Sequence, residues 1–377
     1  MQNPNKDFQF GIEAEYLLVD ADTYQALWYQ DLSFKQLDAI ISKIDLSGVS
    51  LEGLSANAPH SIRSPYIIEG YHVYNENKKP ISILPKGIEI RTPKSPSLKQ
   101  CLALLQTLHH RLSQALFPEG LRLVALSHHP SHTKFEGPQN SRTHEFWGWA
   151  KRAMLTYGPD FNVSIPHDLL SRFDWEDFHA KLNYYAPALT AFSVASPFYN
   201  NALWTPNGVW GHSVRTFYRR EVAPVIEYHP SENHRLEFKP MEMSSDLRDF
   251  ENYFLIWLTL LLDDSLEGRA SDAERLSGFL EVALNGLDSY EVRRRNLEVL
   301  NRASKLLPLW GFNTETLSIP AKQLDTKRTP ANTLQEIYLE SGSIEEVLIH
   351  REKLVTSHTE TVFRKSPNIH SERLSYA

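Results

Sequence analysis

Residues 8–19 alternate between apolar side chains and a second set that contains two acids. The apolar set, which recurs at every second position, consists of Phe8, Phe10, Ile12, Ala14, Tyr16 and Leu18. This period of two predicts a β-strand with one buried face. The opposite face holds Glu13 and Glu15 beside Gly11, where an ordinary solvent-exposed face would mix both signs of charge. We therefore expect a strand that packs on one face and carries acids on the other.

Two more segments, residues 87–92 and 234–240, predict strands that carry acids among residues that should otherwise be buried. Their polar faces hold Glu89, Arg91, Arg235, Glu237 and Lys239. Acids on several strands, each beside a cation or a glycine, indicate a shared floor lined with carboxylates. Clustered carboxylates repel each other and need cations to stay ionised together, and sites of oxygen ligands suit Mg²⁺ or Mn²⁺. The alternative is that these acids lie on the solvated faces of amphipathic strands.

The other expected elements do not alternate regularly between strand and helix. Further strands are expected at residues 121–126 and 161–165. Helices are expected at residues 34–44, 95–116, 143–157, 175–194, 246–266, 273–284, 290–306, 333–340 and 344–354. This order favours an α+β fold with a largely antiparallel sheet over a doubly wound one. We expect a catalytic unit over residues 1–310 and a C-terminal extension of helices and loops, residues 311–377, packed on it.

The composition disfavours several classes of function. A formal net charge of −7 and a pI of about 6.2 argue against binding to nucleic acid or to acidic membranes, which both require a basic face. The single cysteine, Cys101, excludes an intrachain disulfide and a cysteine-ligated structural zinc site. The longest apolar run, residues 254–262, is too short for a membrane-spanning helix, which needs about 20 residues, and residues 1–7 are polar. A cytoplasmic protein that acts on small molecules is therefore expected.

Five segments carry motifs that occur, in this order, in one known enzyme family. Residues 10–20, FGIEAEYLLVD, have the form Gly-x-Glu-x-Glu followed by apolar residues and an Asp. The others are residues 87–93, which end in Thr-Pro, 121–130, which end in His129-Pro130, 213–216, which read Ser-x-Arg-Thr, and the late strand 235–239. Together, over residues 8–265, they resemble the carboxylate–amine ligases related to glutamate–cysteine ligase. No Walker-type phosphate loop or dinucleotide fingerprint is present.

This resemblance implies a glutamine-synthetase-like fold, in which helices back an antiparallel sheet with an acid-lined face. It also implies ATP and Mg²⁺ (or Mn²⁺) as cofactors. The expected reaction joins a carboxylate, such as that of glutamate, to an amine through an acyl phosphate. Because water must not reach that intermediate, a closing loop is expected, and residues 131–142 and 200–211 are the candidates. Proteins of this fold often assemble, so a homo-oligomer is also expected.

Residue by residue, the resemblance assigns three groups of site residues. The expected metal ligands are Glu13, Glu15, Glu89 and Glu237. The expected catalytic residues are Arg215 and Lys239. The residues expected to bind nucleotide or substrate are Arg91, Asn162, Arg235 and His129. On a helix, Arg215 and Arg219 would share a face, and the alternative for this segment is a basic helix on the surface.

The sequence departs from the family pattern at two places. Many relatives carry His-x-His-Val on a strand where this chain reads Asp160-Phe161-Asn162-Val163. Lys239 stands where the family has an arginine, which keeps the charge but loses the two-pronged geometry of guanidinium. Two alternatives to a ligase therefore stay open: another phosphoryl-transfer enzyme of the same superfamily, and a catalytically silent relative that binds nucleotide.

Overall fold

The computed structural model describes residues 8–55, 57–138, 147–352 and 354. Within them lies a seven-stranded sheet of order β2-β3-β1-β5-β9-β8, in which β4 also pairs with β1. Every pair of neighbouring strands is antiparallel. The strands of this sheet are β1 (Gln9–Asp20), β2 (Tyr66–Tyr74), β3 (Pro80–Arg91), β4 (Leu121–Val124), β5 (Pro159–Ser164), β8 (Ile226–His229) and β9 (Arg235–Phe238). The predicted α+β fold with an antiparallel sheet is confirmed.

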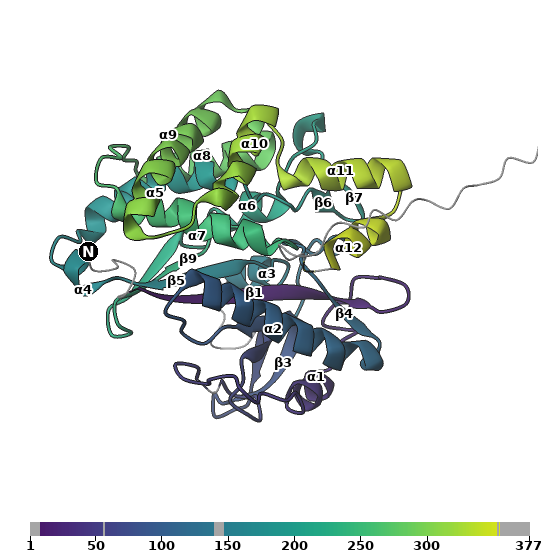
Figure 1. Cartoon of the computed structure of the whole chain (residues 1–377). Coiled ribbons are helices and arrows are strands. Elements are labelled where there is room, and N and C mark those ends of the chain that lie inside the picture. The colour runs from purple at the N-terminus through teal and green to yellow at the C-terminus, as the bar shows by residue number, and fades with distance from the viewer. Residues whose placement is uncertain (1–7, 56, 139–146, 353, 355–377) are drawn as a thin grey trace, which may run out of the picture.

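Helices pack around this sheet, with α5, α8, α9 and α10 gathered on one side of β5 and β9 and α1 and α2 on the other side of the molecule (Figure 1). The first half of the chain contributes α1 (Phe34–Ile41) and α2 (Leu98–Leu116), and the longer helices that follow are α5 (Trp175–Thr190), α7 (Leu247–Leu262), α8 (Asp272–Asn285) and α9 (Tyr290–Leu306). The others are α3 (Trp147–Ala153), α4 (His167–Leu170), α6 (Val214–Arg219), α10 (Ser318–Thr326), α11 (Pro330–Ser341) and α12 (Ile344–Glu352). A short hairpin, β6 (Phe198–Tyr199) and β7 (Ala202–Leu203), lies outside the sheet. Among the described residues, no helix has both the length and the apolar character that crossing a bilayer demands.

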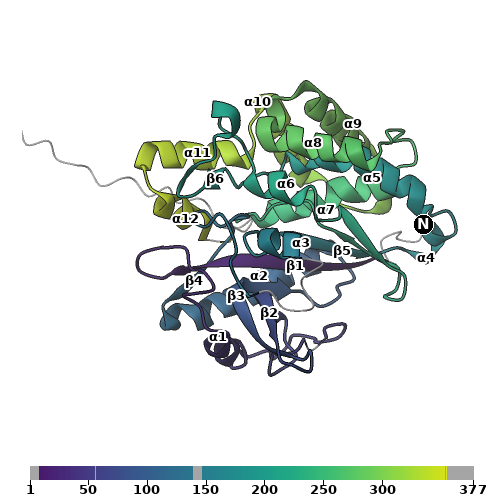
Figure 2. The ribbon, with the colours of Figure 1, turned by 180° about the vertical axis from the view of Figure 1, so that it is seen from behind.

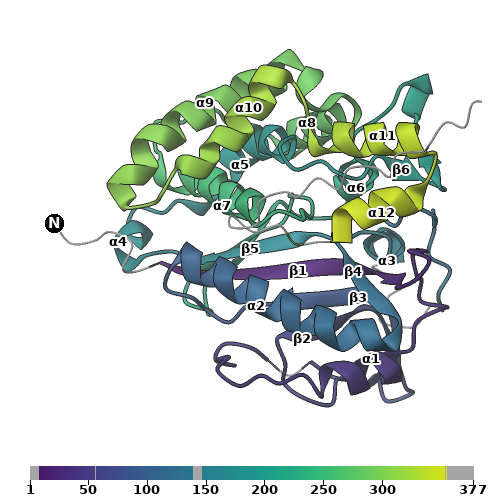
Figure 3. The same ribbon diagram turned by 45° about the vertical axis from the view of Figure 1, so that its right-hand side comes forward.

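The apolar face of β1 is buried under α2, which lies across β1 and β3 (Figure 3). The six apolar side chains that define this face are each at most 2% exposed. The facing stripe of α2 includes Leu105, Leu108 and Leu112, which have no exposed surface. Burial of these side chains fixes the register of β1, since a shift by one residue would turn its acids into the core. The acids must therefore lie on the face that α2 does not cover. Figure 2 shows the molecule from behind, the side opposite to that of Figure 1.

Helix α2 begins later than predicted. Ser97, rather than Ser95, caps it by accepting a hydrogen bond from the amide of Gln100. Ser95 is still extended, because its backbone exchanges two hydrogen bonds of 2.8 and 2.9 Å with Phe10 of β1. The expected start at Ser95 was therefore wrong.

The expected helix 143–157 and one of the two expected closing loops, residues 131–142, are described only in part. Residues 143–146 and 139–142 lie outside the described residues. The described helix, α3, ends at Ala153, because the backbone of Leu155 then accepts from His129 and that of Tyr157 donates to Ser127. Residues 200–211 form β7 and a short 3-10 turn.

The chain after residue 310 packs on the same core as the sheet. Leu334 of α11 and Val347 and Leu348 of α12 belong to the buried cluster that also contains β1. Arg351, at the end of α12, is buried and donates through Nε to the carbonyl of Ala125 at 2.8 Å. The predicted division at residue 310 stays a prediction, and the helices expected in this region are present.

Candidate functional site

The strand register brings acids from five strands onto the uncovered face of the sheet. Glu15 of β1 lies opposite Glu89 of β3, and Glu13 lies opposite Asp160 of β5. Glu237 of β9 lies opposite Asn162 of β5. Two sets of three carboxylates each have oxygen atoms within 4.8 Å of one another. We call them the β3 cluster, which consists of Glu15, Glu69 and Glu89, and the β5 cluster, which consists of Glu13, Asp160 and Glu237.

The β3 cluster lies in a largely buried environment. Burial, together with the neighbouring acids, raises the pKa of Glu69 to about 7 and raises the pKa of Glu89 well above its usual range. Burial would also raise the pKa of Glu15, but the Lys86 ammonium at 2.8 Å lowers it overall. Glu15 also accepts a 2.9 Å hydrogen bond from the amide of Gly158. Glu15 thus gives up its proton more readily than its two neighbours do.

The β5 cluster is arranged around Lys239, whose Nζ contacts a carboxylate oxygen of Glu237 and lies 3.0 Å from Asp160. Burial and then the charges of Glu237 and Asp160 raise the pKa of Glu13 to about 8. Burial also raises the pKa of Asp160, to about 6. Although burial opposes it, Lys239 and Arg235 lower the pKa of Glu237 to about 2.

A cavity of about 530 Å³ opens beside the β5 cluster, over the first half of β1. Four of the predicted site residues line it: Glu13, Arg91, Asn162 and Arg235. Lys94 adds a third cation to its wall. The Asn162 side chain links opposite charges, because its oxygen accepts from Arg235 and its nitrogen donates to Glu13 at 3.4 Å. Three cations and the carboxylate of Glu13 thus meet in a space large enough for a small-molecule ligand.

Arg215 is buried, so the alternative of a basic surface helix does not hold for it. Its side chain is 2% exposed and donates to the carbonyls of Pro240 and Lys239 at 3.1 and 3.2 Å. A Cβ added to Gly158 would lie 2.1 Å from Nη2 of Arg215, so the guanidinium rests directly against the segment that binds Glu15. Arg219, one turn later, is half-buried and donates to the hydroxyl of Thr156 at 3.2 Å.

His129 does not join the acids. Its Nε2 lies 3.2 Å from the carbonyl of Leu27, and its Nδ1 accepts from the amides of Ser131 and His132. The ring packs edge-on against Trp28, with a centroid separation of 4.9 Å. Both ring nitrogens of His129 are thus used in contacts with the backbone of residues 27, 131 and 132.

Sequence reasoning missed Glu69, Lys86 and Glu227 as members of this site. Glu69 follows three buried residues of β2, Tyr66 to Ile68, so an acid within an apolar strand was the signal that could have revealed it. Asp160 was noted as a departure from a family motif and not as a member of the acid floor. Glu227 lies on β8 with its oxygen 3.8 Å from the Lys239 ammonium.

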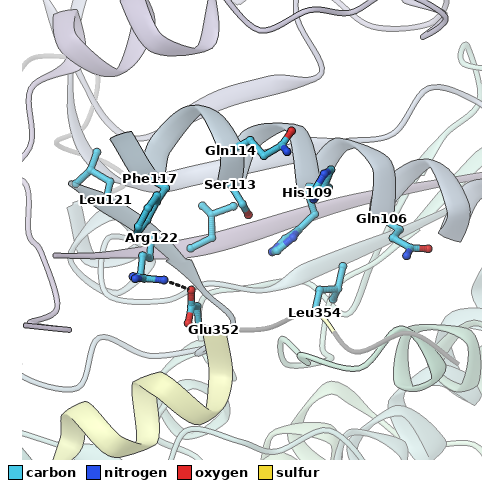
Figure 4. Close-up of a pocket in the computed structure, with 11 residues that line it drawn as sticks. Gln106, His109, Ser113, Gln114, Phe117, Leu121, Arg122, Glu352 and Leu354 are labelled. Atoms are coloured by element: carbon cyan, nitrogen blue, oxygen red, sulfur yellow. Dashed lines mark hydrogen bonds and ion pairs between the residues drawn. The ribbon is translucent and has the colours of Figure 1, made fainter. Parts of the chain in front are cut away.

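A larger cavity, of about 730 Å³, lies elsewhere, between α2, β4 and the end of α12 (Figure 4). Its wall includes His109, Phe117 and the ion pair between Arg122 and Glu352, whose atoms are 2.6 Å apart. None of the clustered acids lines it, and α2 covers the opposite face of the sheet. The chemistry of the acids, rather than the greater volume, therefore marks the candidate site.

Three solved structures share the fold of this chain. A bifunctional glutathione synthetase from Pasteurella multocida aligns with 93% of this chain and 52% of its own, at a TM-score of 0.61 and 15% identity. A glutamate–cysteine ligase from Francisella tularensis in complex with AMP aligns with 92% of this chain and 87% of its own, at a TM-score of 0.59 and 12% identity. PafA, the ligase of the prokaryotic ubiquitin-like protein Pup, aligns with 92% of this chain and 67% of its own, at a TM-score of 0.50 and 14% identity. The chain thus spans about half the length of the bifunctional synthetase, and at these identities the likeness concerns the fold.

The sequence model of glutamate–cysteine ligase family 2 matches residues 9–205, which is just over half of the chain. The chain belongs to this family, as its strand motifs predicted. None of the curated protein sequences matches it.

Proposed function

We propose that the protein is an ATP- and Mg²⁺-dependent ligase that joins the carboxylate of an amino acid, such as glutamate, to an amine. The observation that carries this proposal is the meeting of two carboxylate clusters on one face of the sheet, beside a cavity lined by three cations. Membership of glutamate–cysteine ligase family 2 supports the reaction class. The AMP in the Francisella ligase structure supports the use of a nucleotide.

The β3 cluster fits a hard divalent cation, since it offers three carboxylate oxygens within reach of one another. We propose that Glu15 and Glu89, with Glu69 as a further ligand, hold the metal, and that Glu13 and Glu237 face the nucleotide beside it. Mg²⁺ bound there would offset the negative charge of a triphosphate. Arg91 and Arg235, with Lys94, would contact phosphate oxygens from the cavity wall, as guanidinium and ammonium groups do in other phosphoryl-transfer sites.

The proposed chemistry follows from the weakness of a carboxylate as an electrophile. A carboxylate oxygen of the substrate attacks the γ-phosphorus of ATP, and the bond between that phosphorus and the bridging oxygen breaks, which releases ADP. The amine nitrogen of the second substrate then attacks the acyl carbon and loses a proton, and inorganic phosphate leaves with the bonding electrons. Catalysis of such transfers depends mainly on positioning and electrostatics.

Arg215 and Lys239 retain a proposed role in this reaction. The Lys239 ammonium neutralises charge in the β5 cluster directly. Arg215 acts as a positioning residue, because its guanidinium is used on the backbone carbonyls of Lys239 and Pro240. Its contact with Gly158 connects the β9 end of the site to the segment that holds Glu15.

A screen of amino acids and amines, read by ADP release and product mass, tests the proposal. We expect ADP only when both a carboxylate and an amine are present, together with a product whose mass is their sum less water. The matched variant is Glu15→Gln, which keeps the shape of the side chain but removes its charge. This variant should fold and lose activity by several decades. ADP release with one substrate alone would indicate a different phosphoryl-transfer enzyme, and nucleotide binding without turnover would indicate a silent relative.

A further inference from the structure

The ammonium group of Lys239 lies where three strands of the sheet present carboxylates. Nζ contacts Glu237 of β9, lies 3.0 Å from Asp160 of β5 and lies 3.8 Å from Glu227 of β8. The side chain is only 13% exposed. Two of the three acids that could hold a metal in the β5 cluster are therefore already paired with a cation of the chain itself.

The backbone fixes this ammonium in place. The amide of Lys239 donates to the carbonyl of Val225 at 2.9 Å, and its carbonyl accepts from the buried guanidinium of Arg215 at 3.2 Å. The two hydrogen bonds therefore hold both the amide and the carbonyl of Lys239. The side chain therefore extends from a fixed point toward the acids.

The β3 cluster differs in this respect. Its ammonium, that of Lys86, contacts one of the three acids, Glu15, and donates otherwise to the carbonyls of Thr156 and Ala153. Within the described residues, Glu69 has no ion pair, and Glu89 has only a long contact of 3.8 Å with Arg91. This cluster keeps two acids open toward a metal.

We propose that the Lys239 ammonium takes the place of a divalent ion in the β5 cluster, so that of the two carboxylate clusters only the β3 cluster binds a metal. An ammonium and a divalent cation cannot share the same few carboxylate oxygens, because two positive charges a few ångströms apart in a partly buried site repel strongly. A protonated lysine also has no lone pair with which to ligate a metal. The inference rests on the proposed function for its biological meaning, but not for its test.

Counting bound Mn²⁺ tests it, since the electron paramagnetic resonance signal of free Mn²⁺ falls as the ion binds. The full-length protein is titrated with Mn²⁺ alone, without nucleotide or substrate. We expect Lys239→Met to bind one more Mn²⁺ per chain than the unsubstituted protein, and Lys239→Arg to bind the same number. The double variant with Lys239→Met and Asp160→Asn should lose the additional ion, because that ion needs the freed Asp160.

Asp160→Asn alone provides a second, milder test that does not depend on the folding of Lys239→Met. If Lys239 fills the β5 cluster, this change should alter Mn²⁺ affinity less than threefold, because Asp160 binds no metal. A loss of tenfold or more would overturn the proposal, because Asp160 would then bind a metal beside the lysine. An equal Mn²⁺ count in the unsubstituted protein and Lys239→Met would also overturn it, because Lys239 would then not be the group that keeps an ion out of the β5 cluster. Since no substrate is used, failure of the ligase assay leaves this result unaffected.

Discussion

Binding of Mn²⁺ to the metal-free protein should release protons, and the number released can be worked out from the β3 cluster. The pKa of Glu69 is raised to about 7 and that of Glu89 well above its usual range, because both carboxyls are buried beside other acids. Divalent ions bind the deprotonated form of a carboxyl group. Each ion that enters the cluster at low pH must therefore expel the protons that these groups hold.

The magnitude follows from the position of each pKa relative to the buffer. At pH 6, Glu69, with a pKa of about 7, is about 90% protonated, so Mn²⁺ binding should release roughly one proton from it, and the protons that Glu89 holds add to this number. At pH 8, Glu69 is about 90% ionised, so its share of the release should almost vanish. Mn²⁺ affinity should accordingly rise by roughly tenfold or more per pH unit near pH 6.

Isothermal titration calorimetry in buffers of different ionisation enthalpy measures this number, because each released proton is taken up by the buffer. Glu69→Gln should lower the release at pH 6 by about one proton, since the amide has none to give up. Glu336→Gln is the matched control, because Glu336 lies on α11 in an exposed ion pair with Arg328. Binding heats that do not depend on the buffer at pH 6 would show that the acids are already ionised, and the electrostatic account of this cluster would fail.

Three further outcomes are expected. Arg215→Lys should destabilise the protein by about 2–4 kcal/mol in urea unfolding, because a buried carbonyl loses its charged donor. Arg219→Lys should cost below about 1 kcal/mol, and equal, small effects of the two substitutions would show that Arg215 has no structural role in the interior. Gly158→Ala should cost about 1–3 kcal/mol by the same measurement, because its Cβ would lie 2.1 Å from that guanidinium, and an unchanged midpoint would contradict the packing. Above the range in which the buried histidines titrate, the metal-free protein should lose thermal stability as pH rises from about 7 to 8. The folded-state pKa values of Glu13 and Glu69, about 8 and about 7, lie above that of an unfolded glutamate, so their stabilising contribution is complete at low pH and disappears through the folded-state pKa values. Melting scans that are flat or rise over this range would refute this assignment.

The sequence located five of the seven strands of the sheet in whole or in part, namely β1, β3, β4, β5 and β9, but not β2 or β8. Residues 9–16 of β1 alternate because one face packs in the core and the other is polar, so both the location and the face of this strand followed from the residues. β2 has no such alternation: Tyr66, Ile67 and Ile68 are all buried, and a bulge at Glu69 and Gly70 interrupts its pairing with β3. Its identity as a strand depends on that distant partner, which no local pattern contains.

The true length of β3 was hidden by a proline. The prediction began at residue 87, but the strand extends back to Pro80 and includes Pro85. Proline is unfavourable within a strand because it lacks an amide donor. Pro85 is tolerated here because it pairs with β2, at Gly70, whereas pairing with β1 begins only at Gly87. Lys86, the partner of Glu15, was therefore missed.

Motif resemblance located side chains better than it assigned their roles. Glu13, Arg91, Asn162 and Arg235 were chosen from separate motifs, and the structure brings them to one cavity. His129 came from a motif of equal standing, yet its ring turns toward Leu27 and the following amides. A motif fixes the course of the backbone, whereas the direction of a ring depends on the partners that its nitrogens find.

The balance of charge on the acid floor argues for a single divalent ion. The two clusters together contain six carboxylates, and the cations that contact them are four: Lys86, Arg91, Arg235 and Lys239. Two negative charges therefore lack a fixed partner when all six acids are ionised. In the metal-free protein, protons supply the difference, since Glu13, Glu69 and Glu89 are the acids whose pKa values are raised furthest. One divalent ion carries the same charge, so replacing protons with that ion leaves the face neutral, and a second ion would leave it positively charged until a phosphate or a carboxylate arrived.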